Sequence, residues 1–112
     1  MNRIRTSINP DTHFRVLNIL DENPNITQRE LAKKLGISLG GVNYCLKALI
    51  EIGHIKINNF HKSPNKSNYF YLLTSKGLGQ KAALTSDFLK RKMSEYRALK
   101  NEIEYIQSKL KL

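Results

Sequence analysis

A short segment near the middle of the 112-residue chain carries polar groups on the outward side of a predicted helix. These groups are a hydroxyl, two glycine backbones, an amide, a phenol and an amine, at Ser38, Gly40, Gly41, Asn43, Tyr44 and Lys47. An amide can pair with adenine, an amine with guanine or phosphate, and a phenol with phosphate or a thymine methyl group. The chemistry that suits this set is recognition of a nucleic acid, not bond cleavage.

No catalytic or metal-binding pattern competes with this interpretation. The sequence has no Ser-His-Asp order with a supporting motif, no phosphate loop of the G-x-x-x-x-G-K type and no inward pair of carboxylates. The three histidines, His13, His54 and His61, show no zinc spacing and are interpreted as structural or surface residues. Cys45 lies on an apolar stripe, which favours a small buried side chain over a redox switch. We therefore expect no enzyme activity, no cofactor and no metal.

The polar segment belongs to a predicted pair of short helices between Thr27 and Gly53. Thr27 and Glu30 have the spacing of a capping box, and Gly36 is placed to end the first helix in the left-handed conformation. Ser38 caps the second helix, whose buried stripe is predicted at Val42, Cys45, Leu46, Leu49 and Ile52. This spacing is typical of a helix-turn-helix, which lays its second helix in the DNA major groove, although it also occurs in helix pairs that bind no DNA.

Other elements flank this pair. A first helix is predicted from Asn9-Pro10 to Asn23-Pro24, and two alternating strands at Ile55–Phe60 and Tyr69–Leu73 form a hairpin, or wing. Lys62 and Lys66 at the hairpin tip could reach phosphates or the minor groove, or could be an ordinary solvated loop. Arg29 and Lys33 could bind backbone phosphates, but a plain solvated face explains them equally well.

Gly40 and Gly41 are unfavourable in a helix, at roughly 1 kcal/mol each relative to alanine. Our hypothesis is that they let the helix N-terminus approach a phosphate closely. The alternative is that they relieve crowding against the preceding helix.

The last helix is capped by Thr74 and runs without a breaker from about Lys81 to Leu110. A heptad pattern predicts dimerisation through one face of this helix, with Lys92 at one weak position of the seam. The residues of the seam are Leu89, Tyr96, Leu99, Ile103, Ile106 and Leu110. The stripe could instead pack back on the domain, and a parallel or an antiparallel pair remains possible.

The chain has a net charge of +10 and no Asp or Glu between residues 52 and 86, which favours a polyanionic partner such as DNA. The single cysteine fits a reducing compartment, and no apolar run is long enough to span a membrane. The N-terminus lacks the apolar region of a signal peptide. A cytoplasmic, nucleoid-associated protein is expected.

These residues resemble the MarR family of winged helix-turn-helix regulators, through L-A-K-K-L-G-I-S, V-N-Y-C-L-K-A-L-I-E-I-G and Y-L-L-T-S-K-G. The strings I-S-L-G-G-V-N-Y-C-L-K-A-L-I-E and F-L-K-R-K-M-S-E-Y are similar to a bacterial subgroup associated with exopolysaccharide gene clusters. The resemblance implies a dimeric transcriptional regulator that contacts DNA through Ser38, Gly40, Asn43, Tyr44, Lys47, Lys62 and Lys66. The segments outside the domain are shorter than in larger family members, so a small-molecule effector pocket is doubtful.

The sequence thus predicts a mainly α protein of the α+β class. Residues 9–75 form a winged helix-turn-helix domain with a two-stranded wing, and residues 76–112 form a long dimerisation helix. Its expected function is sequence-specific binding of double-stranded DNA as a homodimer, and the alternative is a winged helix that binds an acidic protein partner.

Overall fold

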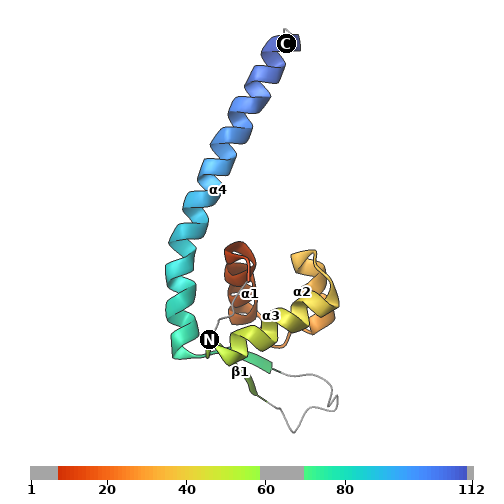
Figure 1. Ribbon diagram of the computed structural model, residues 1–112, viewed down its shortest axis with the longest axis vertical. Coiled ribbons are helices and arrows are strands. Elements are labelled where there is room, and N and C mark those ends of the chain that lie inside the picture. Colours follow the sequence, from red (N-terminus) through yellow and green to blue (C-terminus); the bar gives the residue numbers. More distant parts are fainter. Residues whose placement is uncertain (1–7, 59–69, 111–112) are drawn as a thin grey trace, which may run out of the picture.

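A computed structural model describes residues 8–58 and 70–110. The helices are α1 (Pro10–Glu22), α2 (Gln28–Leu35), α3 (Leu39–Glu51) and α4 (Ser75–Leu110), and the strands are β1 (Ile55–Asn58) and β2 (Phe70–Leu73). Helices α1 to α3 and the strands form one packed body, from which the distal part of α4 projects (Figure 1). The predicted fold class is therefore confirmed.

Local sequence signals place the helix ends. The Asn9 side chain accepts hydrogen bonds from the backbone N–H groups of Asp11 and Thr12, and Pro10 occupies the first helical position. Thr27 and Glu30 form the predicted capping box. Gly36 ends α2 with φ of 69°, in the left-handed region that glycine adopts at little cost.

The two strands pair in antiparallel register, with Ile55 opposite Leu73 and Asn58 opposite Phe70. The residues predicted to extend these strands, at positions 59, 60 and 69, lie outside the described residues, and so do Lys62 and Lys66. Tyr71 ties β2 to the start of α2, because its hydroxyl accepts a hydrogen bond from Gln28 Nε2 at 3.0 Å. The base of the wing is thus fixed to the helix-turn-helix.

One apolar core joins these elements. Its buried members come from α1, α2, α3, both strands and the turn between α1 and α2, and they are Val16, Leu17, Leu20, Ile26, Leu31, Ala32, Val42, Leu46, Leu49, Ile55 and Tyr71. Cys45 is buried beside them, as predicted, and burial raises the pKa of its thiol. Ile52, predicted in the buried stripe, lies at the C-cap of α3 and is only partly buried.

Helix α4 begins at Ser75 and is continuous over 36 residues, about 54 Å. Gly77 and Gly79 do not interrupt it. Gly77 meets a tertiary requirement, because a Cβ at this position would lie 1.9 Å from the carbonyl oxygen of His54. The sequence alone gave no sign of this close approach.

The first half of α4 packs against α1. Phe14 and Phe88 stack with ring centroids 4.5 Å apart, Lys81 pairs with Asp21 at 2.8 Å and Arg91 pairs with Asp11 at 2.7 Å. Since this contact lies beyond residue 75, α1 and the start of α4 form one packed unit. The predicted domain boundary between residues 75 and 76 stays a prediction.

Candidate nucleic-acid interface

The outward side of α3 carries the predicted DNA-contacting residues. Ser38, Gly40, Tyr44 and Lys47 are exposed, and Gly41 and Asn43 are partly exposed. The Tyr44 side chain has 53% of its surface accessible. The opposite side of the same helix packs into the core through Val42, Cys45, Leu46 and Leu49. The period of the helix therefore separates a buried apolar stripe from a polar outer face.

Ser38 has a structural role besides its predicted contact with DNA. Its Oγ accepts a hydrogen bond from the backbone N–H of Gly41 at 3.0 Å, which caps α3. The hydroxyl hydrogen is not used in that bond and can donate to a phosphate oxygen. The cap and a phosphate contact are thus compatible.

The two glycines of α3 have different surroundings. A Cβ on Gly40 would meet only Ser38 Oγ, at 3.9 Å, whereas a Cβ on Gly41 would lie 3.3 Å from Ser38 Oγ and 3.5 Å from Ile37 Cδ1. The nearest atoms in both cases belong to the turn and not to α2. The alternative of crowding against the preceding helix is therefore wrong, and a close approach of the helix N-terminus to a phosphate stays a prediction.

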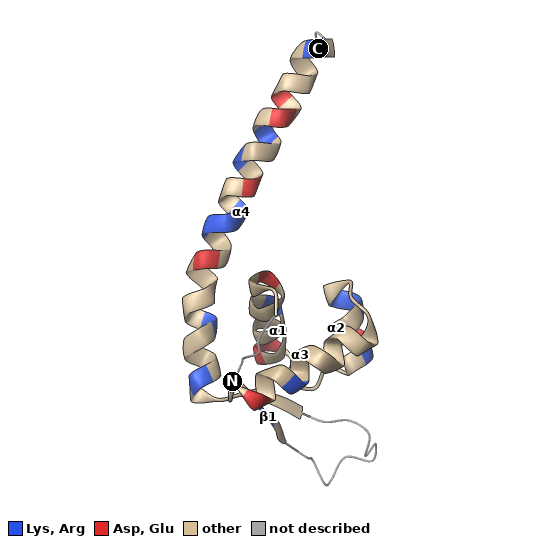
Figure 2. Ribbon diagram, viewed as in Figure 1, with Lys and Arg blue, Asp and Glu red and all other residues tan. Residues whose placement is uncertain are grey.

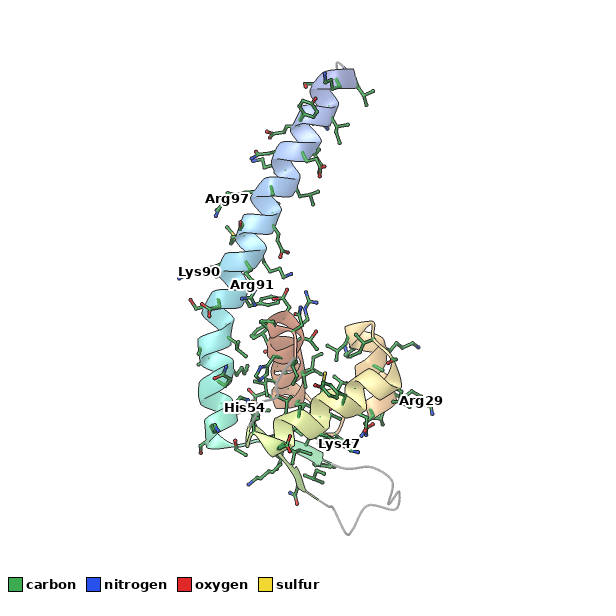
Figure 3. The ribbon with its side chains drawn as sticks, in the orientation of Figure 1. Arg29, Lys47, His54, Lys90, Arg91 and Arg97 are labelled. Atoms are coloured by element: carbon green, nitrogen blue, oxygen red, sulfur yellow. The ribbon has the colours of Figure 1, made fainter. Side chains whose placement is uncertain are left out.

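Basic side chains lie on and beside the helix-turn-helix. Arg29 and Lys33 of α2, Lys47 of α3 and Lys56 of β1 are exposed. Figure 3 shows Arg29 and Lys47 pointing outward from α2 and α3. Within residues 8–58 and 70–110, every ion pair involves a cation of α4. The cations of α2 and α3 therefore carry charge that no salt bridge in the described part of the chain neutralises.

The predicted seam of α4 is exposed, and most of it lies beyond the part of α4 that packs on α1. Its six apolar residues, Leu89, Tyr96, Leu99, Ile103, Ile106 and Leu110, are between 46% and 64% exposed. They alternate along the helix with charges of both signs (Figure 2). Exposed apolar surfaces of this length are usually covered by another protein surface.

Lys92, the weak position of the predicted seam, forms ion pairs in the structure. Its Nζ lies 2.9 Å from Asp11 of α1 and 3.0 Å from Glu95, so the side chain turns toward α1. Met93 is the exposed apolar residue of that turn, at 45%. The stripe therefore passes from Leu89 through Met93 to Tyr96, a detail that the heptad assignment missed.

The histidines were predicted to be structural or surface residues, and two of them are in contact. His13 Nε2 lies 3.1 Å from His54 Nδ1. Among the described residues, no group of three His, Cys, Asp or Glu side chains is placed to hold a metal ion.

None of the described helices combines the length and apolar character needed to cross a membrane.

Comparison with known proteins agrees with this geometry. The winged helix-turn-helix DNA-binding family matches residues 10–56. No curated protein matches the chain in sequence. Residues 10–56 therefore match a winged helix-turn-helix DNA-binding segment, and the structure shows the same fold there.

Solved structures with a similar fold include regulators of transcription. A MarR/EmrR family regulator from Acinetobacter sp. ADP1 is similar with a TM-score of 0.67 at 19% identity, over 89% of this chain and 72% of that one. A double mutant of ZitR from Lactococcus lactis, in its apo form, has a TM-score of 0.61 at 26% identity, over 82% and 67%. The fold is therefore the one found in MarR-family transcriptional regulators of known structure, in agreement with the resemblance inferred from the sequence.

A third similar structure is that of the zinc-dependent MarR family regulator AdcR in its Zn(II)-bound state, with a TM-score of 0.61 at 21% identity, over 98% of this chain and 77% of that one. The described residues of this chain do not fit a comparable metal site, because no three ligands come together. The similar region covers 66% of AdcR from Streptococcus pyogenes and 79% of a MepR mutant from S. aureus.

Proposed function

We propose that this chain is a dimeric, sequence-specific regulator of transcription that lays α3 in the major groove of its operator. The observation that carries the proposal is the outer face of α3, which is polar, capped at its start and flanked by cations outside any described ion pair. Helices that read DNA contact base edges through residues near their N-terminus. The start of α3 has the required exposure.

Each predicted residue has a separate role in this proposal. Asn43 and Lys47 contact base edges, since an amide can bond adenine and an amine can bond guanine. Tyr44 contacts a phosphate or a thymine methyl group, and the free N–H groups at the start of α3, beside Gly40 and Gly41, approach a phosphate. Backbone phosphates are further contacted by Ser38, Arg29 and Lys33, and by Lys62 and Lys66 on the basis of the sequence alone.

The proposed dimer forms through the exposed stripe of α4. The distal half of α4 extends beyond the packed body (Figure 1), so a second copy can cover it without displacing α1. The contact between α1 and α4 lies in the first half of α4, through Lys81, Phe88 and Arg91, and the stripe from Tyr96 onward lies beyond it. Pairing about a two-fold axis predicts a roughly palindromic operator with half-sites about one helical turn apart.

A salt series on a fluorescent duplex tests DNA binding. Affinity should fall steeply as salt rises, because each neutralised phosphate releases condensed counterions. Weak binding that does not change with salt would refute the proposal and favour an acidic protein partner. Selection of binding sites from random DNA then gives the operator, and a palindrome is expected.

The dimer has its own test, sedimentation of two matched variants. Ile103→Glu places a charge on the stripe, whereas Tyr105→Glu places the same charge on another exposed part of α4. The first variant should sediment as a monomer and the second as a dimer. If Ile103→Glu remains dimeric, the proposed stripe is not the interface.

The genes under control are proposed from the resemblance to the exopolysaccharide-associated subgroup, with action on the nucleoid in the cytoplasm. Chromatin immunoprecipitation should recover DNA upstream of exopolysaccharide biosynthesis genes. Recovery of unrelated loci alone would remove this part of the proposal and leave the regulator itself intact.

A further inference from the structure

His54 occupies the junction of three elements. Its backbone N–H donates to the carbonyl oxygen of Leu49 near the end of α3, and its own carbonyl oxygen accepts from the backbone N–H of Thr74 at 3.0 Å. The same carbonyl lies against Gly77 in the first turn of α4, and β1 begins at the next residue. Figure 3 shows His54 between α3 and the start of α4. A change at this residue therefore reaches α3, β1 and α4 together.

The His54 side chain extends the junction to α1. It is the one polar side chain among the described buried residues, with 6% of its surface accessible. Its Nδ1 lies 3.1 Å from Nε2 of His13, and the two rings are stacked with centroids 5.1 Å apart. In the neutral pair one ring N–H donates to the other ring nitrogen, and the tautomer decides which ring donates.

The proton count of this pair determines whether the contact can exist. One added proton leaves one ring as a donor and the other as an acceptor, so the hydrogen bond survives. A second proton turns both facing nitrogens into N–H donors. Two donors and two positive charges then face each other, and the pair must separate.

The surroundings oppose any positive charge on the pair. Burial lowers the pKa of His13 and of His54, and the nearby charge of Lys76 on α4 lowers the pKa of His54 further. No carboxylate of α1 or α3, neither Asp11, Asp21 nor Glu51, contributes to either shift. Two of these carboxylates are instead held by cations of α4, through the pairs of Asp11 with Arg91 and Lys92 and of Asp21 with Lys81.

We propose that the His13–His54 contact is a pH-sensitive switch that holds α3 and β1 in place against α1 and α4. With the pair neutral, the recognition helix keeps its position relative to the dimerisation helix. With both rings protonated, the contact opens and the DNA-binding arrangement is lost, so acid weakens operator binding. This inference rests on the proposed function, because the property that the switch changes is the affinity for DNA.

The sign of the pH effect makes the proposal specific. Adding a proton to a histidine beside DNA adds a cation, which normally strengthens binding to phosphates. The switch predicts weaker binding in acid, because protonation of both rings lowers the fraction of protein that is competent to bind DNA. That fraction, and with it the apparent affinity, falls by up to about tenfold for each pH unit below the pKa of the pair.

The experiment measures duplex affinity by fluorescence anisotropy at constant salt, from about pH 4 to about pH 7.5, together with histidine ring signals by NMR, because the lowered pKa values of both rings place the second protonation below the usual histidine range. The test variant is the double substitution His13→Gln and His54→Asn, which keeps polar groups at the two facing positions but cannot titrate. His61→Gln is the matched control, because it removes the third histidine, which lies outside the described residues.

We expect wild type and His61→Gln to lose affinity in acid and the double variant to stay constant. A loss that persists in the double variant, or an affinity that rises in acid, overturns the switch. If the double variant does not fold, His13→Gln alone serves, because a pair with one titrating ring cannot hold two charges.

Failure of the proposed function is distinguishable from failure of the switch. A protein that binds no duplex at any pH refutes the proposed function. The NMR signals still decide the switch in that case. In that case, acid should shift the NMR signals of the Thr74 and Gly77 amides in wild type but not in the double variant. Wild-type signals that do not change in acid overturn the switch.

Discussion

Gly77→Ala tests the close approach of α4 to the turn before β1. A Cβ at position 77 would lie 1.9 Å from the carbonyl oxygen of His54 and 2.9 Å from its carbonyl carbon. Non-bonded heavy atoms prefer about 3.5 Å, so the helix and the turn must separate by more than about 1 Å. Both partners are backbone atoms, and no side-chain rotation can relieve the clash.

The expected loss of stability follows from three effects. Overpacking costs about 1 to 3 kcal/mol, and weakening the hydrogen bond from Thr74 to His54 costs about 1 kcal/mol. Alanine recovers about 1 kcal/mol through its helix propensity. The net loss is about 1 to 3 kcal/mol, or a fall of roughly 4 to 12 °C in the melting temperature.

Gly79→Ala is the matched control, since a Cβ there has no atom within 4 Å. It should raise the free energy of unfolding by up to about 1 kcal/mol, because it removes a glycine from the same helix. Thermal and urea unfolding followed by circular dichroism measures both variants. If Gly77→Ala is as stable as Gly79→Ala, the argument from close packing is refuted.

Three further predictions concern DNA binding and acid stability. Gly40→Ala should stabilise α3 by up to about 1 kcal/mol and weaken DNA binding; an affinity equal to that of Gly79→Ala would exclude close approach to a phosphate. Lys47→Ala should weaken binding and lower the salt slope by about one if the amine contacts phosphate, with Lys90→Ala on exposed α4 as the unaffected control; a base contact would instead relax preference at one operator position. Hydrogen bonds from Lys92 and Arg91 hold the pKa of Asp11 below its usual 3.8, so its contribution to stability is present above that pH and is lost as pH falls through the lower folded value. Asp11→Asn should remove this acid-dependent loss in melting curves between about pH 2 and pH 5, and an unchanged pH profile would contradict the assignment.

The positions of the helices were predictable because their signals are local. The Asn9 cap, the Thr27–Glu30 capping box, the left-handed Gly36 and the Ser38 cap each act within one helical turn, and all are present in the structure. The apolar period likewise placed Val42, Leu46 and Leu49 in the core. The DNA-contacting and dimerisation residues remain predictions, although the exposure of those that the structure describes agrees with those roles.

The errors and omissions share a different cause. The heptad pattern marked Lys92 as a weak position of the seam, and it did not show that Asp11, which is 81 positions earlier in the chain, pairs with this side chain. Gly77 lowers the helix propensity of the first turn of α4, and the close approach of the His54 carbonyl, which requires a glycine there, is visible only in the structure. No local pattern contains the identity of a residue that folding brings near.

By itself, the sequence determined the helix ends, the apolar stripes, the basic charge and the polar outer face of α3, because capping and periodicity depend on neighbours within a few residues. Only the tertiary structure decided which side of α4 packs on α1 and which stays exposed. It also joined His13 to His54 across 41 positions and set α4 directly on a backbone carbonyl. These contacts depend on the packing of several elements around one core, so their partners become known only when the chain is folded.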